Sequence, residues 1–176
     1  MDKTYQTDLR RTFLFQGLPE PLTPASAHLQ IFDNYIENTR LRLRSIRVPE
    51  ENKWTRVLQQ RFPALNNDLS HWKMAEIHLD ETEHLTLEKF EGREIRKNRY
   101  FFEWSGRQLE LDVFLGRLWG LNLMTVHFET GKELIDFLPP DFVICEVTDD
   151  KFFTGEILVE KTFDEVRREF QKISQG

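Results

Sequence analysis

Short segments in which polar and apolar residues alternate dominate this sequence, and the clearest of them is TRLRLRSIR, within residues 39–47. Successive side chains of a β-strand point to opposite faces of a sheet, so Arg40, Arg42 and Arg44 would share one face. The leucines between them would share the other. Three neighbouring like charges are harmless on a face open to water, but inside a protein they need counter-ions or a bound anion.

Similar alternating or aromatic segments recur along the chain and predict a mainly β fold. Strands are expected at residues 9–15, 28–36, 39–48, 54–62, 72–79, 100–104, 108–114 and 121–128. Ser105-Gly106 is typical of a hairpin turn. Helices are expected at 82–90, with Thr82 as N-cap, at 132–137, and as a docked amphipathic helix at about 161–174. Many strands with few helices indicate an α+β fold whose antiparallel sheet is closed or nearly closed on itself.

Composition limits the class of protein. The 176 residues are expected to form a single domain over 1–176. The net charge of -6 argues against a general nucleic-acid binder. Cys145 is the only cysteine, so no internal disulfide can form, and a reducing compartment fits best. We find neither the apolar core of a signal peptide nor about 20 consecutive apolar residues, so we expect a cytoplasmic protein without a membrane partner. The sequence does not indicate the oligomeric state.

Charged residues also alternate on other predicted strands. Lys97 and Arg99 are two residues apart, as are Glu110 and Asp112, so each pair would point one way. Further basic candidates on other strands are Arg10, Arg56 and Arg61. These faces are either exposed to solvent or turned into a polar barrel interior. In the second case a phosphate chain would suit them, because guanidinium binds phosphate oxygens in pairs.

Seven short motifs follow one another between about residues 8 and 158. They are DLRRTFLF from Asp8, DNYI from Asp33, LRLR from Leu41, KNRY from Lys97, ELDVF from Glu110, GL from Gly120 and EVTDD from Glu146. In this order they resemble the CYTH superfamily, also called triphosphate tunnel metalloenzymes. That superfamily includes class IV adenylate cyclases, thiamine triphosphatases and inorganic triphosphatases.

The resemblance implies a closed antiparallel eight-stranded tunnel barrel with helices packed outside, in which basic residues bind a triphosphate and carboxylates hold Mg²⁺ or Mn²⁺. The residues expected to bind phosphate are Arg42, Arg44, Lys97, Arg99, Arg10, Arg40 and Arg56. The residues expected to hold the metal are Glu110, Asp112, Glu76 and Asp8.

The chain departs from the superfamily pattern at the metal site. Where the superfamily opens with E-x-E-x-K, this chain has Asp8, Arg10 and Thr12, and its later E-x-E strand aligns with Thr125-Val126-His127. An arginine places positive charge where a metal ion would bind. His127 would suit a softer metal such as zinc or manganese, or have no metal role. The phosphate-binding half of the pattern is therefore better preserved than the metal-binding half.

Three functions stay open at this point. The first is a catalytically degenerate, metal-independent protein that binds a polyphosphate, a nucleotide or another triphosphate-containing small molecule. The second is an active divalent-metal-dependent triphosphatase acting on inorganic, nucleoside or thiamine triphosphate. The third is a partner-binding protein that kept the fold, with Phe152-Phe153, Trp119 and the C-terminal helix as its interaction surface. A cyclase is disfavoured, because no base-recognition pocket is evident.

Overall fold

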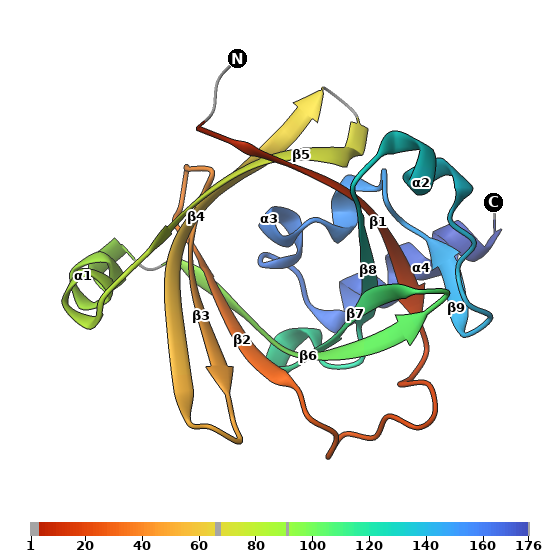
Figure 1. Cartoon of the computed structure of the whole chain (residues 1–176), viewed down its shortest axis with the longest axis horizontal. Coiled ribbons are helices and arrows are strands. Elements are labelled where there is room, and N and C mark those ends of the chain that lie inside the picture. The colour runs from red at the N-terminus through yellow and green to blue at the C-terminus, as the bar shows by residue number, and fades with distance from the viewer. Residues whose placement is uncertain (1–3, 66–67, 91, 176) are drawn as a thin grey trace.

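The computed structural model describes residues 4–65, 68–90 and 92–175. The strands in this part of the chain are β1 (Gln6–Phe15), β2 (Leu29–Tyr35), β3 (Leu41–Val48), β4 (Lys53–Leu65), β5 (Asp68–His78), β6 (Arg93–Trp104), β7 (Arg107–Phe114), β8 (Asn122–Phe128) and β9 (Val143–Glu146). They form one sheet in the order β5-β4-β3-β2-β6-β7-β8-β1-β9. An additional antiparallel pairing of β1 with β5 closes β1–β8 into a barrel, which Figure 1 shows end-on. The predicted closed, mainly β barrel is confirmed.

Alternation along each strand separates a polar interior from an outer face. On β1, for example, Asp8, Arg10 and Thr12 point into the barrel. The β6–β7 hairpin turns at Ser105 and Gly106, which have φ values of 48° and 74°. Two positive φ values in a row are those of a type I′ hairpin turn, as the sequence predicts.

Apolar side chains fill one end of the barrel, and we call the segment that carries them, residues 147–159, the plug. It contains the 3₁₀ helix η3 (Lys151–Phe153) and α3 (Gly155–Leu158), and Figure 1 shows α3 at the centre of the ring. The buried side chains of Phe153 and Leu158 join one apolar cluster with Phe114 of β7 and with α4 (Phe163–Gln175). The plug backbone also packs closely, because a Cβ on Gly155 would lie 1.8 Å from the Tyr35 hydroxyl oxygen.

The remaining helices lie outside the barrel. They are α1 (Glu81–Leu87) with η1 (Glu88–Phe90), η2 (Gly116–Leu118) and α2 (Gly131–Asp136). The predicted N-cap of α1, Thr82, is wrong. Asp80 caps the helix instead, because its carboxylate accepts from the Glu83 backbone N–H while the Glu83 side chain accepts from the Asp80 N–H, both at 2.8 Å. Within the described residues, no helix combines the length and apolar character needed to cross a membrane.

Candidate functional site

The barrel contains a cavity of about 350 Å³, which is within the usual range for small-ligand sites. Strands β1–β8 and the plug contribute its walls. Among the described residues, the lysine and arginine side chains that line it are Arg10, Arg42, Arg44, Arg61, Lys97 and Arg99, and His127 lines it as well. The acidic ones are Asp8, Asp33, Glu110, Asp112 and Asp150. The cavity therefore carries a slight excess of positive charge in a protein that is acidic as a whole.

Asp33 compensates the two inward arginines of β3. Its carboxylate accepts two hydrogen bonds from Arg44, from Nε at 2.6 Å and from Nη2 at 2.7 Å, and Arg42 Nη1 lies 3.6 Å away. Arg42 Nε also donates to Gln59 Oε1 at 2.7 Å. Burial alone would raise the pKa of Asp33, but Arg44 and then Arg42 outweigh it and hold this pKa well below its usual range. Asp33 thus explains how neighbouring arginines coexist on the inward face of β3.

Asp112 likewise compensates Lys97 and Arg99, the two basic residues of β6 that line the cavity. It accepts from Lys97 Nζ at 2.6 Å, and from Arg99 Nε and Nη2 at 2.6 and 2.8 Å. Arg99 Nη1 also lies 2.5 Å from Glu110 Oε2. Burial lowers the pKa of Lys97 to about 8, although Asp112 opposes this shift. The carboxylate and both cations are buried, so they form an internal ion network.

His127 bridges two carboxylates near the start of β1. Its Nδ1 lies 2.6 Å from Asp8 Oδ1, and its Nε2 lies 3.4 Å from Glu110 Oε2. Burial lowers the pKa of His127, but its hydrogen bonds to both carboxylates outweigh burial and raise the pKa to about 9. His127 is therefore a cation at neutral pH, with both ring nitrogens donating.

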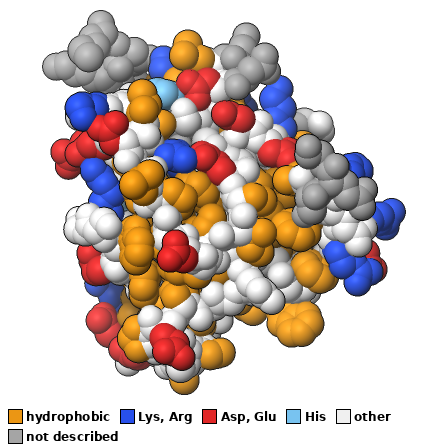
Figure 2. Space-filling model, turned by 90° about the vertical axis from the view of Figure 1, so that its right-hand side faces the viewer, with side chains coloured by type: hydrophobic (Ala, Val, Ile, Leu, Met, Phe, Trp, Pro, Cys, Tyr) orange, Lys and Arg blue, Asp and Glu red, His pale blue; other side chains and the backbone are white. Residues whose placement is uncertain are grey.

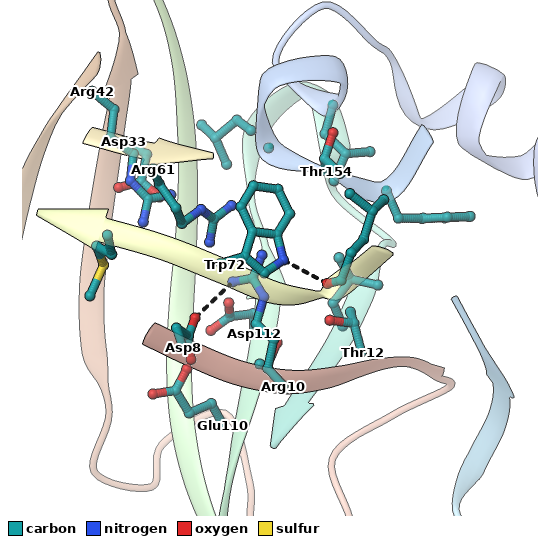
Figure 3. A pocket seen from close by; sticks show the side chains of 18 of the residues that line it. Asp8, Arg10, Thr12, Asp33, Arg42, Arg61, Trp72, Glu110, Asp112 and Thr154 are labelled. Atoms are coloured by element: carbon teal, nitrogen blue, oxygen red, sulfur yellow. Dashed lines mark hydrogen bonds and ion pairs between the residues drawn. The ribbon is translucent and has the colours of Figure 1, made fainter. Parts of the chain in front are cut away.

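Arg10 and Arg61 differ from the other cavity cations because no carboxylate accepts from them at hydrogen-bonding distance. Arg10 Nη1 is 3.8 Å from Asp8 Oδ2, Arg61 Nη2 is 3.9 Å from Glu156 Oε1, and both Nε atoms are buried without a hydrogen-bond partner. Both guanidinium groups instead contact Trp72, with Cζ 4.5 and 4.4 Å from the ring centroid (Figure 3). Burial lowers the pKa of each, and a neighbouring guanidinium lowers it further.

The predicted metal ligands do not fit a divalent cation in this arrangement. Asp8, Glu110 and Asp112 each lie within ion-pair distance of the protein's own basic side chains. In the part of the chain that the structure describes, no group of three or more His, Cys, Asp or Glu side chains is placed to hold a metal ion. Mg²⁺ and Mn²⁺ need carboxylate oxygens that are free to bind them.

The structure brings most of the predicted site residues to the cavity. Those that line it are Arg10, Arg42, Arg44, Lys97, Arg99, Asp8, Glu110 and Asp112. Their roles toward a ligand stay predictions.

Three predicted residues lie elsewhere. Arg40 precedes β3, and its Cζ lies 4.2 Å from the centroid of the Phe62 ring. Arg56 lies on the outer face of β4, because inward residues of that strand have odd numbers. Glu76 does not line the cavity, although it shares its face of β5 with the lining residues Trp72 and Met74. It accepts from Gln59 Nε2 and lies 3.5 Å from His78 Nε2.

Sequence reasoning missed the role of three cavity residues. Asp33 stands directly opposite Arg44 in the β2–β3 register, and this pairing could have been found by aligning the two predicted strands. The sequence indicates Arg61 only as a basic residue on a predicted strand and predicts no role for it. Trp72 carries no sequence signal for its function, because its contacts come from the two flanking strands.

The surface expected under the partner-binding alternative is only partly exposed. Phe153 and the apolar face of α4 pack into the core cluster, whereas Trp119 is 71% exposed. Figure 2 shows apolar side chains gathered over the middle of the side of α2 and β9, with most charged ones toward its edges, and Ile135, Leu138 and Ile144 are exposed.

Comparison with known proteins places this barrel among tunnel proteins. No protein-family model matches the chain. A curated relative, the inorganic triphosphatase of Nitrosomonas europaea, is 41% identical over 69 residues, which is 39% of this chain and 46% of that protein. The chain therefore matches less than half the length of that relative. The crystal structure of an inorganic triphosphatase aligns with a TM-score of 0.58 and 26% identity, covering 88% of this chain and 95% of that one. A second crystal structure of that same protein, there described as hypothetical, aligns with a TM-score of 0.59 and 26% identity, over 88% and 99% of the two chains.

Fold and site together define a class: a closed antiparallel barrel with a charged tunnel that a plug closes at one end. The resemblance to the CYTH superfamily is confirmed by the barrel and by these structural neighbours, and the chain has a CYTH-like tunnel fold.

Proposed function

We propose that this protein binds the phosphate chain of a triphosphate-containing or polyphosphate small molecule inside the barrel, and that it is catalytically degenerate. The observation that carries the proposal is the convergence of basic side chains from β1, β3, β4 and β6 on one cavity. Guanidinium and ammonium groups bind phosphate oxygens through charge-assisted hydrogen bonds. The residues proposed to contact the ligand are Arg42, Arg44, Lys97 and Arg99, at positions where the resemblance implies phosphate binding, and Arg10, which would replace part of the metal's charge.

The state of the carboxylates supports catalytic degeneracy. A metal-dependent phosphohydrolase uses its cation to neutralise phosphate charge and to align a water molecule. Here Asp112 holds Lys97 and Arg99, while Asp8 and Glu110 hold His127. The protein's own cations occupy the positions that a metal ion would need.

The second candidate is an active divalent-metal-dependent triphosphatase. The observation that favours it is the alignment of 88% of this chain with the structure of an inorganic triphosphatase. In that case Mg²⁺ or Mn²⁺ would have to displace His127 and Arg99 from Asp8, Glu110 and Asp112.

A thermal-shift titration with tripolyphosphate and with ATP, each with magnesium and again with excess chelator, tests both candidates. A ligand at a hundredfold excess over Kd stabilises the native state by about 2.7 kcal/mol. We expect stabilisation that persists in chelator, and no phosphate release with Mg²⁺ or Mn²⁺. Phosphate release that depends on metal would establish the second candidate. No shift under any condition would contradict both.

A further inference from the structure

Most cations of the cavity fall into two groups, which differ in how closely a carboxylate compensates their charge. Arg44, Lys97 and Arg99 donate to buried carboxylates at 2.6 to 2.8 Å. Arg10 and Arg61 have only carboxylates at 3.8 and 3.9 Å, and their Nε atoms have no acceptor. The first group is thus paired closely with the protein's own carboxylates. Arg42 is intermediate, because it lies 3.6 Å from Asp33, which already accepts two hydrogen bonds from Arg44. Arg10 and Arg61 are therefore the arginines of the cavity that carboxylates compensate least.

Trp72 fixes the position of these two side chains. The indole is 2% exposed, and its Nε1–H donates to the Leu69 carbonyl oxygen at 2.6 Å. β5, which carries Trp72, pairs with β1 on one side and with β4 on the other. Arg10 reaches the ring from β1 and Arg61 from β4 (Figure 3). Cation–π contact with one immobile ring thus holds two like charges in a defined arrangement.

Nothing in the described cavity completes the hydrogen bonding of this pair. Asp8 is the nearest carboxylate to Arg10, but its Oδ1 is bound by His127 at 2.6 Å. Glu156, the nearest to Arg61, lies on α3 and is partly exposed. A buried guanidinium with an unused donor is unfavourable, and an anion that accepts from both groups would remove that penalty.

We propose that Arg10 and Arg61, held on Trp72, form the principal anion receptor of the tunnel, and that it binds phosphoryl oxygens of a linear polyphosphate without a divalent cation. This inference rests on the proposed function and names the part of the cavity that carries out binding. Arg44, Lys97 and Arg99 would then contribute less to binding than Arg10 and Arg61, because Asp33 and Asp112 already accept their hydrogen bonds.

Calorimetric titration of tripolyphosphate in excess chelator tests the receptor. The variants are Arg10→Gln and Arg61→Gln, and the control is Arg47→Gln. Arg47 matches them because its Cζ lies 5.8 Å from the Trp54 ring centroid and its Nε also lacks an acceptor, yet it lies outside the cavity. We expect each receptor variant to weaken binding about tenfold or more, the usual effect of losing a charge-assisted hydrogen bond, and the control to change it less than about twofold.

Thermal unfolding of the unliganded variants separates a binding role from a structural one. Arg10→Gln and Arg61→Gln remove a buried charge whose carboxylate partner is 3.8 or 3.9 Å away, so their Tm should equal or exceed that of the wild type. Arg99→Gln removes the guanidinium group that pairs with Asp112 and Glu110, so it leaves buried negative charge without compensation and should lower Tm. Wild-type binding in chelator with unchanged affinity in both receptor variants would overturn the receptor but leave the proposed function standing. Binding only with magnesium would overturn its metal independence, and no wild-type binding at all would contradict the proposed function itself.

Discussion

Single residues decide how this barrel tolerates charge in its interior. Asp33 accepts two hydrogen bonds from Arg44 and lies 3.6 Å from Arg42, so one carboxylate compensates two guanidinium groups. Breaking a buried ion pair by removing one partner typically costs about 3–5 kcal/mol, because the remaining charge is left buried without compensation. The inward arginines of β3 are therefore compatible with folding only while Asp33 is ionised.

Asp33→Asn should lower the free energy of unfolding at neutral pH by about 3 kcal/mol or more, for the reason just given. Urea denaturation measures this change. The control is Asp136→Asn, which removes an exposed carboxylate paired with Lys132 and should change stability by less than about 1 kcal/mol. Equal effects of the two substitutions would show that Asp33 does not compensate the arginines.

The same carboxylate predicts an acid dependence. The pKa of Asp33 in the folded protein lies below its usual range, despite burial, because of Arg44 and Arg42. A depressed folded-state pKa stabilises the protein above the unfolded pKa of about 3.9, and that stabilisation is lost as the pH falls further. The stability difference between wild type and Asp33→Asn should therefore shrink as the pH falls from about 5 toward about 2. A difference that stays constant over this range in urea titrations would contradict the assignment.

At the scale of elements, the plug depends on one close contact. Gly155 leaves no room for a side chain, since a Cβ would lie 1.8 Å from the Tyr35 hydroxyl oxygen. Gly155→Ala should destabilise the protein by about 1–3 kcal/mol, because α3 or Tyr35 must shift. Gly131→Ala is the matched control, because nothing lies within 4 Å of its Cβ position and alanine favours the helix that Gly131 begins. Thermal unfolding of both variants measures the contrast, and equal stability would show that the plug is loosely packed.

The start of α1 offers a second test at this scale. Asp80 and Glu83 form a reciprocal capping box, whereas Thr82 lies inside the helix. Asp80→Ala should cost about 1 kcal/mol of unfolding free energy. Thr82→Ala should lower the unfolding free energy by less than about 0.5 kcal/mol, because Thr82 is exposed and takes no part in the capping box. If denaturant titrations give the larger loss for Thr82→Ala, the helix begins where the sequence pattern places it.

Sequence reasoning located the elements that carry a strong local pattern and missed those defined by distant contacts. The alternation around Arg42 and the Ser105-Gly106 turn are local signals, and both predicted the structure. β9 has only four residues, as does α3, whose Leu158 is buried through contacts with distant strands, so neither has a comparable signal. Which side chains of a strand face inward also depends on the register of that strand in the barrel. On β4 the odd-numbered residues face inward, so Arg56 faces outward although its neighbours on either side do not.

At the scale of the whole molecule, charge is distributed unevenly between interior and surface. The chain has a net charge of -6, yet the cavity lining holds more basic than acidic side chains among the described residues. The remainder of the protein is accordingly net negative. A long polyanion that must lie along the surface meets repulsion over most of its length, whereas a short phosphate chain can enter the tunnel and contact its basic side chains.

This distribution predicts discrimination between a short polyphosphate and a nucleic acid. At about 0.15 M salt, tripolyphosphate should raise the Tm in chelator, while a single-stranded oligonucleotide at the same phosphate concentration should leave it unchanged. Nucleic-acid affinity comes mainly from basic residues that neutralise successive backbone phosphates on an accessible face, and surface attraction of this kind weakens as salt rises. The cations of the tunnel are buried, so salt should weaken tripolyphosphate binding less steeply. An oligonucleotide that competes with tripolyphosphate would show that the basic residues can be reached from the surface, and the tunnel would then be an open groove with a wider choice of ligands.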